Sequence, residues 1–168
     1  MLETLITSKT RLRILIKFFI NVTTNGHLRG LATEMQESTN AIRKELNNLS
    51  DAGYLDKFNE KNRVSYKANT KHPLFLTLQK IIHQHIGLES IVSSILERLG
   101  SIKTIIVVGD YANGIDTGVI EVVLVGDDLD KDYINRLANK IKSKIDREVH
   151  FIAKNSYEGV GLILFQIN

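Results

Sequence analysis

Cysteine is absent from the 168 residues, proline occurs once, and no long apolar run is present. The lack of cysteine excludes disulfides and thiolate metal sites. A membrane-spanning helix needs about 20 consecutive apolar residues, so we expect no membrane partner. The amino-terminal stretch MLETLITSKTRLRILIKFFI has a charge inside every apolar run and no small-residue cleavage site. We therefore expect no signal peptide and predict a cytoplasmic protein.

Charge is distributed unevenly along the chain. Hydrophobic residues make up 43% of the sequence and charged residues 24%, as in soluble globular proteins. Residues 1–86 contain 13 Lys/Arg against 7 Asp/Glu, whereas residues 87–168 contain 9 against 12. The overall charge of +3 thus combines +6 in the first half with −3 in the second. This asymmetry predicts a polyanionic partner for the first half alone.

Three helices are predicted in the first half. From Ser8 to Phe19 the apolar residues recur at helical spacing, and a shorter helix is expected over Leu28–Met35 after the Asn25–Gly26 turn. Ser38 can cap a third helix that runs through Leu49, because its hydroxyl can accept an early backbone N–H. The buried stripe of this third helix is expected to consist of Ile42, Leu46 and Leu49.

The rest of the chain adds strands and further helices. The stretches YLDKF and RVSYKA, joined by the polar turn NEKN, predict a β-hairpin. Three helices followed by a hairpin is the order of a winged helix-turn-helix. Pro73 is expected to open another helix at its first turn, and Gly87 to break it before a helix over LESIVSSILERLG. Beyond it we expect the strands KTIIVVG and IEVVLVG, a helix from about Leu129, and the strands REVHFIA and VGLILFQIN.

This alternation predicts a small α/β domain at the carboxyl end. The expected fold is therefore a two-domain α+β or α/β chain. It consists of a winged helix over residues 1–70, linker helices over residues 71–99 and the small α/β domain over residues 100–168.

The third helix is the candidate for reading DNA. Arginine can pair with guanine and asparagine with adenine in the major groove, and a hydroxyl at a helix amino terminus suits phosphate. Basic residues of the hairpin would meet the backbone or the minor groove. The alternative is a solvated helix face beside an ordinary charged hairpin. The predicted contacts to double-stranded DNA are Ser38, Thr39, Asn40, Arg43, Lys44, Asn47, Lys61, Arg63 and Lys67.

The motifs SKTRLRIL, HLRGLATEMQESTNAIRKELNNLSDAGYL and VSYKANTKHPLF resemble the ArsR-like winged-helix transcriptional regulators over about residues 7–80. The resemblance implies a homodimeric regulator on a pseudo-palindromic operator, with half-sites about one helical turn apart. Gly30 departs from the pattern, because relatives usually carry an acidic or polar helix former there. Glycine weakens a helix by up to ~1 kcal/mol relative to alanine.

Residues 100–155 resemble a minimal nucleotidyltransferase-like domain of the DNA polymerase β superfamily. Active members have a Gly-Ser turn followed by Asp-x-Asp on a strand and a third carboxylate on the next strand. Gly109 matches the glycine, but Asp110 stands in place of the serine. The three carboxylate positions fall on Val119, Glu121 and His150.

These replacements remove what the chemistry needs. Two-metal phosphoryl transfer requires clustered carboxylates that hold cations about 4 Å apart. Val119 cannot ligate a metal, His150 is a poor ligand for Mg²⁺, and Asp110 would repel a triphosphate. We therefore expect no catalysis, no metal and no cofactor.

The altered domain can then serve packing, dimerisation or ligand sensing. In the sensing case Gly109, Asp110, Asp116, Glu121 and His150 would line a pocket for an unidentified small-molecule effector. An active nucleotidyltransferase delivered by a winged helix is the enzymatic alternative. A protein–protein adaptor that does not bind DNA is a third.

Overall fold

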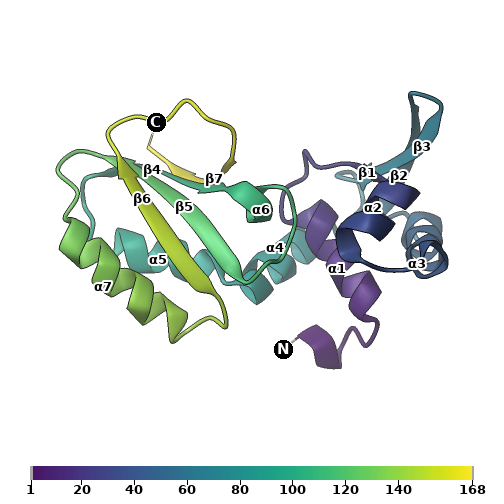
Figure 1. Ribbon diagram of the computed structural model, residues 1–168, viewed down its shortest axis with the longest axis horizontal. Helices are drawn as coiled ribbons and strands as arrows, with labels where there is room; N and C mark the ends of the chain where they lie inside the picture. The colour runs from purple at the N-terminus through teal and green to yellow at the C-terminus, as the bar shows by residue number, and fades with distance from the viewer. Residues whose placement is uncertain (1, 168) are drawn as a thin grey trace. The chain divides into compact units, whose positions relative to one another are not determined.

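The computed structural model describes residues 2–167 (Figure 1). The chain forms two compact units, one ending at His85 and one beginning at Ile86. Each unit combines helices with a β-sheet, which confirms the expected mixed two-domain class. The division between the units falls inside the segment 71–99 that the sequence assigned to linker helices.

The first unit contains three helices followed by a hairpin. A short strand between the first two helices completes a three-stranded antiparallel sheet of order β1-β3-β2, as in a winged helix-turn-helix. In chain order the elements are η1 (Leu2–Thr4), α1 (Lys9–Phe19), β1 (Gly26–His27), α2 (Leu28–Met35), α3 (Thr39–Asp51), β2 (Leu55–Glu60), β3 (Arg63–Ala68) and α4 (Phe75–Ile86).

Helices α1 and α2 confirm the predicted ranges, and α3 begins as predicted but continues two residues beyond Leu49 to Asp51. The hydroxyls of Ser8 and Ser38 accept the backbone N–H groups of Arg11 and Ala41, so both serines are N-caps. A cap of this type satisfies one of the amides that a helix start leaves without a partner. Ile42 and Leu46 are fully buried, as the apolar spacing of the third helix predicted.

Buried charged groups tie α1 to the other two helices. Ser8 Oγ donates a hydrogen bond to Glu45 Oε1 at a distance of 2.8 Å, and Arg11 Nε donates one to Glu45 Oε2 at 2.7 Å. Burial alone would raise the pKa of Glu45, but the hydrogen bonds from Arg11 and Ser8 outweigh it, so the pKa lies below the ordinary value. Lys17, also buried, pairs with Glu34 at 2.8 Å. These links fix how α1 packs on α2 and α3.

The predicted hairpin turn and the predicted start of the fourth helix are wrong. The hairpin turn is only Lys61 and Asn62, with φ of 48° and 61°, because Asn59 and Glu60 continue β2 and pair with β3. Two left-handed central residues are typical of a type I′ turn, whose twist matches that of the strands. Helix α4 begins at Phe75, so Pro73 lies in the turn before it and not in its first helical turn.

The second unit is built around a four-stranded mixed sheet of order β6-β5-β4-β7 (Figure 1). β4 pairs antiparallel with β5 and β7, whereas β5 and β6 are parallel and are joined through α7. A parallel pair needs such a crossover connection. The elements are α5 (Leu88–Leu96), β4 (Ile102–Val108), α6 (Gly109–Ala112), β5 (Val119–Gly126), α7 (Lys131–Lys142), β6 (Glu148–Lys154) and β7 (Leu162–Gln166).

One face of this sheet is covered by helices, and the middle of the other face is covered by a loop. Helices α5 and α7 contact each other and the sheet. On the other face Ile106, Val123 and Val125 form a buried cluster against which Tyr157, from the loop between β6 and β7, is packed. Coverage on both sides explains why β4 and β5 are nearly continuous runs of aliphatic residues.

An N-cap and a glycine determine where two helices of this unit begin. Helix α7 begins at Lys131, two residues later than predicted, because Asp130 is its N-cap and accepts the N–H of Tyr133. Gly87 has a φ of +94°, and a Cβ there would lie 2.4 Å from Ile145 Cγ2. The predicted break at Gly87 is confirmed. Among the helices that the structure describes, none has the length and apolarity to cross a membrane.

Candidate nucleic-acid interface

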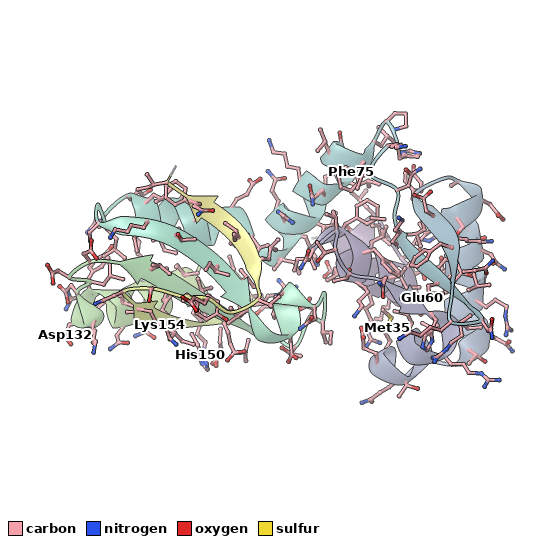
Figure 2. The ribbon with its side chains drawn as sticks, turned by 90° about the horizontal axis from the view of Figure 1, so that it is seen from above. Met35, Glu60, Phe75, Asp132, His150 and Lys154 are labelled. Atoms are coloured by element: carbon pink, nitrogen blue, oxygen red, sulfur yellow. The ribbon has the colours of Figure 1, made fainter. Side chains whose placement is uncertain are left out.

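The outward face of α3 and the hairpin carry all the predicted DNA contacts at the surface. Each of the nine residues is exposed, from Ser38 at the start of α3 to Lys67 on β3. The hairpin turn lies at the end of the strand marked by Glu60 in Figure 2. Local helical and strand periodicity places these side chains outward because Ile42, Leu46, Tyr66 and other apolar residues occupy the inward positions.

A groove of about 670 Å³ brings part of this set together. Arg43 and Asn47 reach it from α3, and Arg63 reaches it from β3. The groove therefore joins the candidate recognition helix to the wing strand. Its full lining is His27, Leu28, Arg29, Arg43, Asn47, Arg63, Val64 and Tyr66.

The other predicted residues lie outside this lining. Asn40 Oδ1 accepts a hydrogen bond from Arg43 Nη1 at 2.9 Å, which orients the guanidinium. The hydroxyl of Ser38 accepts the Ala41 N–H. Lys67 Nζ lies 5.4 Å from the centre of the Phe58 ring, within the range of a cation–π contact. Lys61 forms the hairpin turn, and Thr39 and Lys44 are exposed on α3.

His27 and Arg29 were missed by the sequence analysis. His27 is the N-cap of α2, where its Nδ1 accepts the Gly30 N–H over 2.9 Å. Its Nε2 lies 2.8 Å from Arg63 Nη1, 36 residues along the chain. The position before a predicted helix was a usable signal for a cap. However, histidine is not among the preferred capping residues, and the contact with Arg63 depends on the sheet pairing of β1 with β3.

The position of the His27 ring also explains why residue 30 is a glycine. A Cβ at Gly30 would lie 2.8 Å from His27 Cε1. Real Cβ atoms are not found so close to another heavy atom, so any larger residue would displace the imidazole. Glycine here leaves room for the capping ring.

In the second unit, two of the five predicted pocket residues are direct neighbours in the sheet. Glu121 on β5 is in register with His150 on β6. The Glu121 carboxylate lies over Gly109, where a Cβ would be 2.2 Å from Oε2. Asp110 is exposed in α6, and its carbonyl accepts the N–H groups of Asn113 and Ile115.

His150 also lines a polar groove of about 550 Å³ on the side of α7, together with Asn135, Asn139 and Glu148 among others. Its exposed side chain on β6 is labelled in Figure 2. Among the described residues, no group of three or more carboxylate and histidine side chains is arranged to hold a metal ion.

Asp116 belongs to a network that the sequence did not predict. Tyr111 is fully buried, and its hydroxyl donates a hydrogen bond to Asp116. The same hydroxyl accepts hydrogen bonds from Arg147 Nε and from the Gly118 N–H, both at a distance of 3.0 Å. Arg147 Nη2 donates to Asp116 Oδ2 over 2.6 Å.

Burial, followed by the Asp116 hydrogen bond and charge, raises the pKa of Tyr111 well above its ordinary range. Burial alone would lower the pKa of Arg147, but Asp116 outweighs it and the pKa is raised. The tyrosine therefore stays neutral and the arginine stays charged, and the hydrogen bonds that both make to Asp116 fix the loop between α6 and β5.

Comparisons with known proteins add little to this geometry. No protein-family model matches the chain, and no curated protein matches it. One solved structure, that of Sso10a-2, a DNA-binding protein from Sulfolobus solfataricus, is similar at 18% identity and a TM-score of 0.35. The similarity covers 53% of this chain and 90% of that one. A TM-score of this size does not establish a common fold.

Proposed function

We propose that the first unit binds double-stranded DNA, with α3 in the major groove and the β2–β3 hairpin as a wing on the backbone or the minor groove. The observation that carries this proposal is the groove in which Arg43 and Asn47 of α3 lie beside Arg63 of β3. The charge of +6 over residues 1–86 supports a polyanionic partner.

The side chains on α3 have the chemistry for reading bases. An arginine can donate two parallel hydrogen bonds to guanine, and an asparagine can donate to and accept from adenine. The Arg43 guanidinium donates a hydrogen bond to Asn40 Oδ1. The Asn47 side chain is exposed one turn further along the helix. We assign base contacts to Arg43 and Asn47, and phosphate contacts to Ser38, Lys61 and Lys67.

The DNA-binding unit is proposed to serve a homodimeric transcriptional regulator, which the ArsR-like motifs support. A twofold dimer would require two half-sites about one helical turn apart. The second unit is proposed to be a scaffold for packing, dimerisation or effector sensing, without nucleotidyl transfer. Two features support this part of the proposal: by the nucleotidyltransferase resemblance Val119 stands where a metal-binding carboxylate is expected, and Glu121 fills the space over Gly109 where a nucleotide phosphate would approach.

The direct test compares Arg43→Ala and Asn47→Ala with the unchanged protein on a duplex obtained by selection from random sequences. Each substitution should weaken specific binding by about 1–3 kcal/mol and relax preference at one base position. Asn48→Ala is the matched control. Asn48 is exposed on α3 but lines a separate groove with Arg11 and Leu15. Unchanged affinity and base preference in both variants would remove α3 from DNA recognition.

The two alternatives have their own signatures. Metal-dependent nucleotide transfer that disappears in Glu121→Gln would show that the second unit is an enzyme. If the protein has no salt-dependent affinity for any duplex, the first unit is an adaptor.

A further inference from the structure

The groove between α2, α3 and β3 has the composition of an anion site. Its lining contains Arg29, Arg43, Arg63 and His27, and no acidic residue is part of that lining. Three exposed guanidinium groups around one groove give it a positive potential that attracts an anion. Arginine is also the side chain best suited to hold a phosphate through two parallel hydrogen bonds.

The contact between His27 and Arg63 gives an independent reason for an anion. A neutral imidazole has one ring nitrogen that accepts and one that donates. Because Nδ1 accepts the Gly30 N–H, Nε2 carries the proton and points it toward Arg63. A guanidinium can only donate, so two donors face each other over 2.8 Å. The two nitrogens are too close for an atom to stand between them, but an oxygen anion bound beside them, at the open groove, would accept from both N–H groups when the nitrogens move apart.

The groove also has room for more than a bare anion. Its volume of about 670 Å³ is in the range of small-molecule sites. Leu28, Val64 and Tyr66 give part of the lining an apolar character that suits the carbon face of a sugar. The ligand class that matches both features is a phosphate ester.

We propose that His27, Arg29 and Arg63 form a phosphate-ester site beside the recognition helix. One source of the phosphate is the DNA backbone, and in that case the inference rests on the proposed DNA binding. A free phosphorylated small molecule has the same chemistry and is the second source. Arg43 lies at the α3 side of the site and links it to base reading.

The test has one arm without DNA and one with it. In the first, backbone amide shifts of His27, Gly30 and Arg63 are followed by NMR during titration with a nucleoside monophosphate, against sodium chloride at equal ionic strength. Saturable shifts are expected in the unchanged protein and should be lost in Arg29→Gln and Arg63→Gln. Arg98→Gln, an equal charge change in the second unit, should keep them.

In the second arm, duplex affinity is measured between ~50 and ~200 mM salt. Each phosphate contact contributes about 0.9 to the slope of log K against log salt. Losing one contact should therefore shrink the loss of affinity over this range by about 3–4-fold. Arg29→Gln and Arg63→Gln should each do so for all sequences alike, whereas Arg98→Gln should not.

Two further variants test the imidazole without removing an arginine. His27→Asn keeps a good N-cap but no longer places a ring against Arg63, and Gly30→Ala displaces the ring through the 2.8 Å approach to Cε1. Both should weaken nucleoside monophosphate binding. Unchanged binding in both would contradict a role for His27.

The outcomes separate the two proposals. Reduced salt slopes support the site with DNA as the source. Saturable monophosphate shifts without an effect on DNA support it with a free phosphorylated compound as the source, and they do so even if the protein binds no duplex. If Arg43→Ala weakens DNA binding while neither arm responds to Arg29→Gln or Arg63→Gln, the phosphate-ester site is wrong and the proposed function stands.

Discussion

Replacing Glu45 with glutamine is the sharpest test of how the first unit is held together. The carboxylate is buried and accepts hydrogen bonds from Ser8 and Arg11 at 2.8 Å and 2.7 Å. Glutamine has nearly the same shape, so packing is kept while the charge is lost. A hydrogen bond to a charged group contributes about 1.5–3 kcal/mol. The Arg11 side chain is 41% exposed and can be rehydrated, so we expect a loss in this range and not the larger cost of a stranded buried charge.

The stabilisation that Glu45 contributes should depend on pH. The folded pKa of Glu45 lies below its ordinary value of 4.5, so the unfolded chain takes up the proton first as pH falls. The stabilisation is therefore complete above the ordinary pKa and is lost as pH falls through the lowered folded value. Stability of Glu45→Gln should change less over the acid range than that of the unchanged protein.

Urea unfolding at several pH values measures this difference. Hydrogen exchange of α1 and α3 amides should accompany it, because a chain of two units need not unfold in one transition. Glu37→Gln is the matched control, since its pair with Arg13 spans 3.6 Å and is half-exposed, and such pairs contribute about 0–1 kcal/mol. A loss from Glu45→Gln that stays constant from neutral to acid pH would refute the role of the ionised carboxylate.

Three further substitutions test separate structural claims. Tyr111→Phe removes the hydroxyl shared by Asp116, Gly118 and Arg147 and should destabilise the second unit by about 1–3 kcal/mol; an unchanged urea midpoint would contradict the network. Gly87→Ala should cost about 2 kcal/mol or more from its left-handed φ and the approach to Ile145, seen as a lower thermal midpoint. Ser38→Ala should cost about 1 kcal/mol, and Ser38→Asp, which restores an oxygen cap, should recover most of it.

Much of the first unit was predictable because its signals are local. A serine cap followed by apolar residues at helical spacing determines where α1 and α3 begin and which face each buries. The hairpin followed from two strand-forming stretches, although the turn was shorter than predicted. A two-residue turn depends on left-handed backbone at Lys61 and Asn62, which is not obvious from a polar run of four.

The candidate site was only partly predictable. Arg43 and Asn47 could be assigned to one surface from helical periodicity alone. Their meeting with Arg63, His27 and Arg29 in one groove could not, because it depends on β3 pairing with β1 across some 40 residues. Histidine as a helix cap, with Gly30 beneath its ring, also required knowledge of where the imidazole lies.

The sequence alone determined the order of the main helices and strands and the basic first half, since each is a property of residues near one another in the chain. Tertiary structure decided which charges face each other. It placed Asp116 against Arg147 and Tyr111, and His27 against Arg63. Charge interactions act through space over a few ångströms, and residues tens of positions apart reach that distance only when strand pairing and helix packing bring them together.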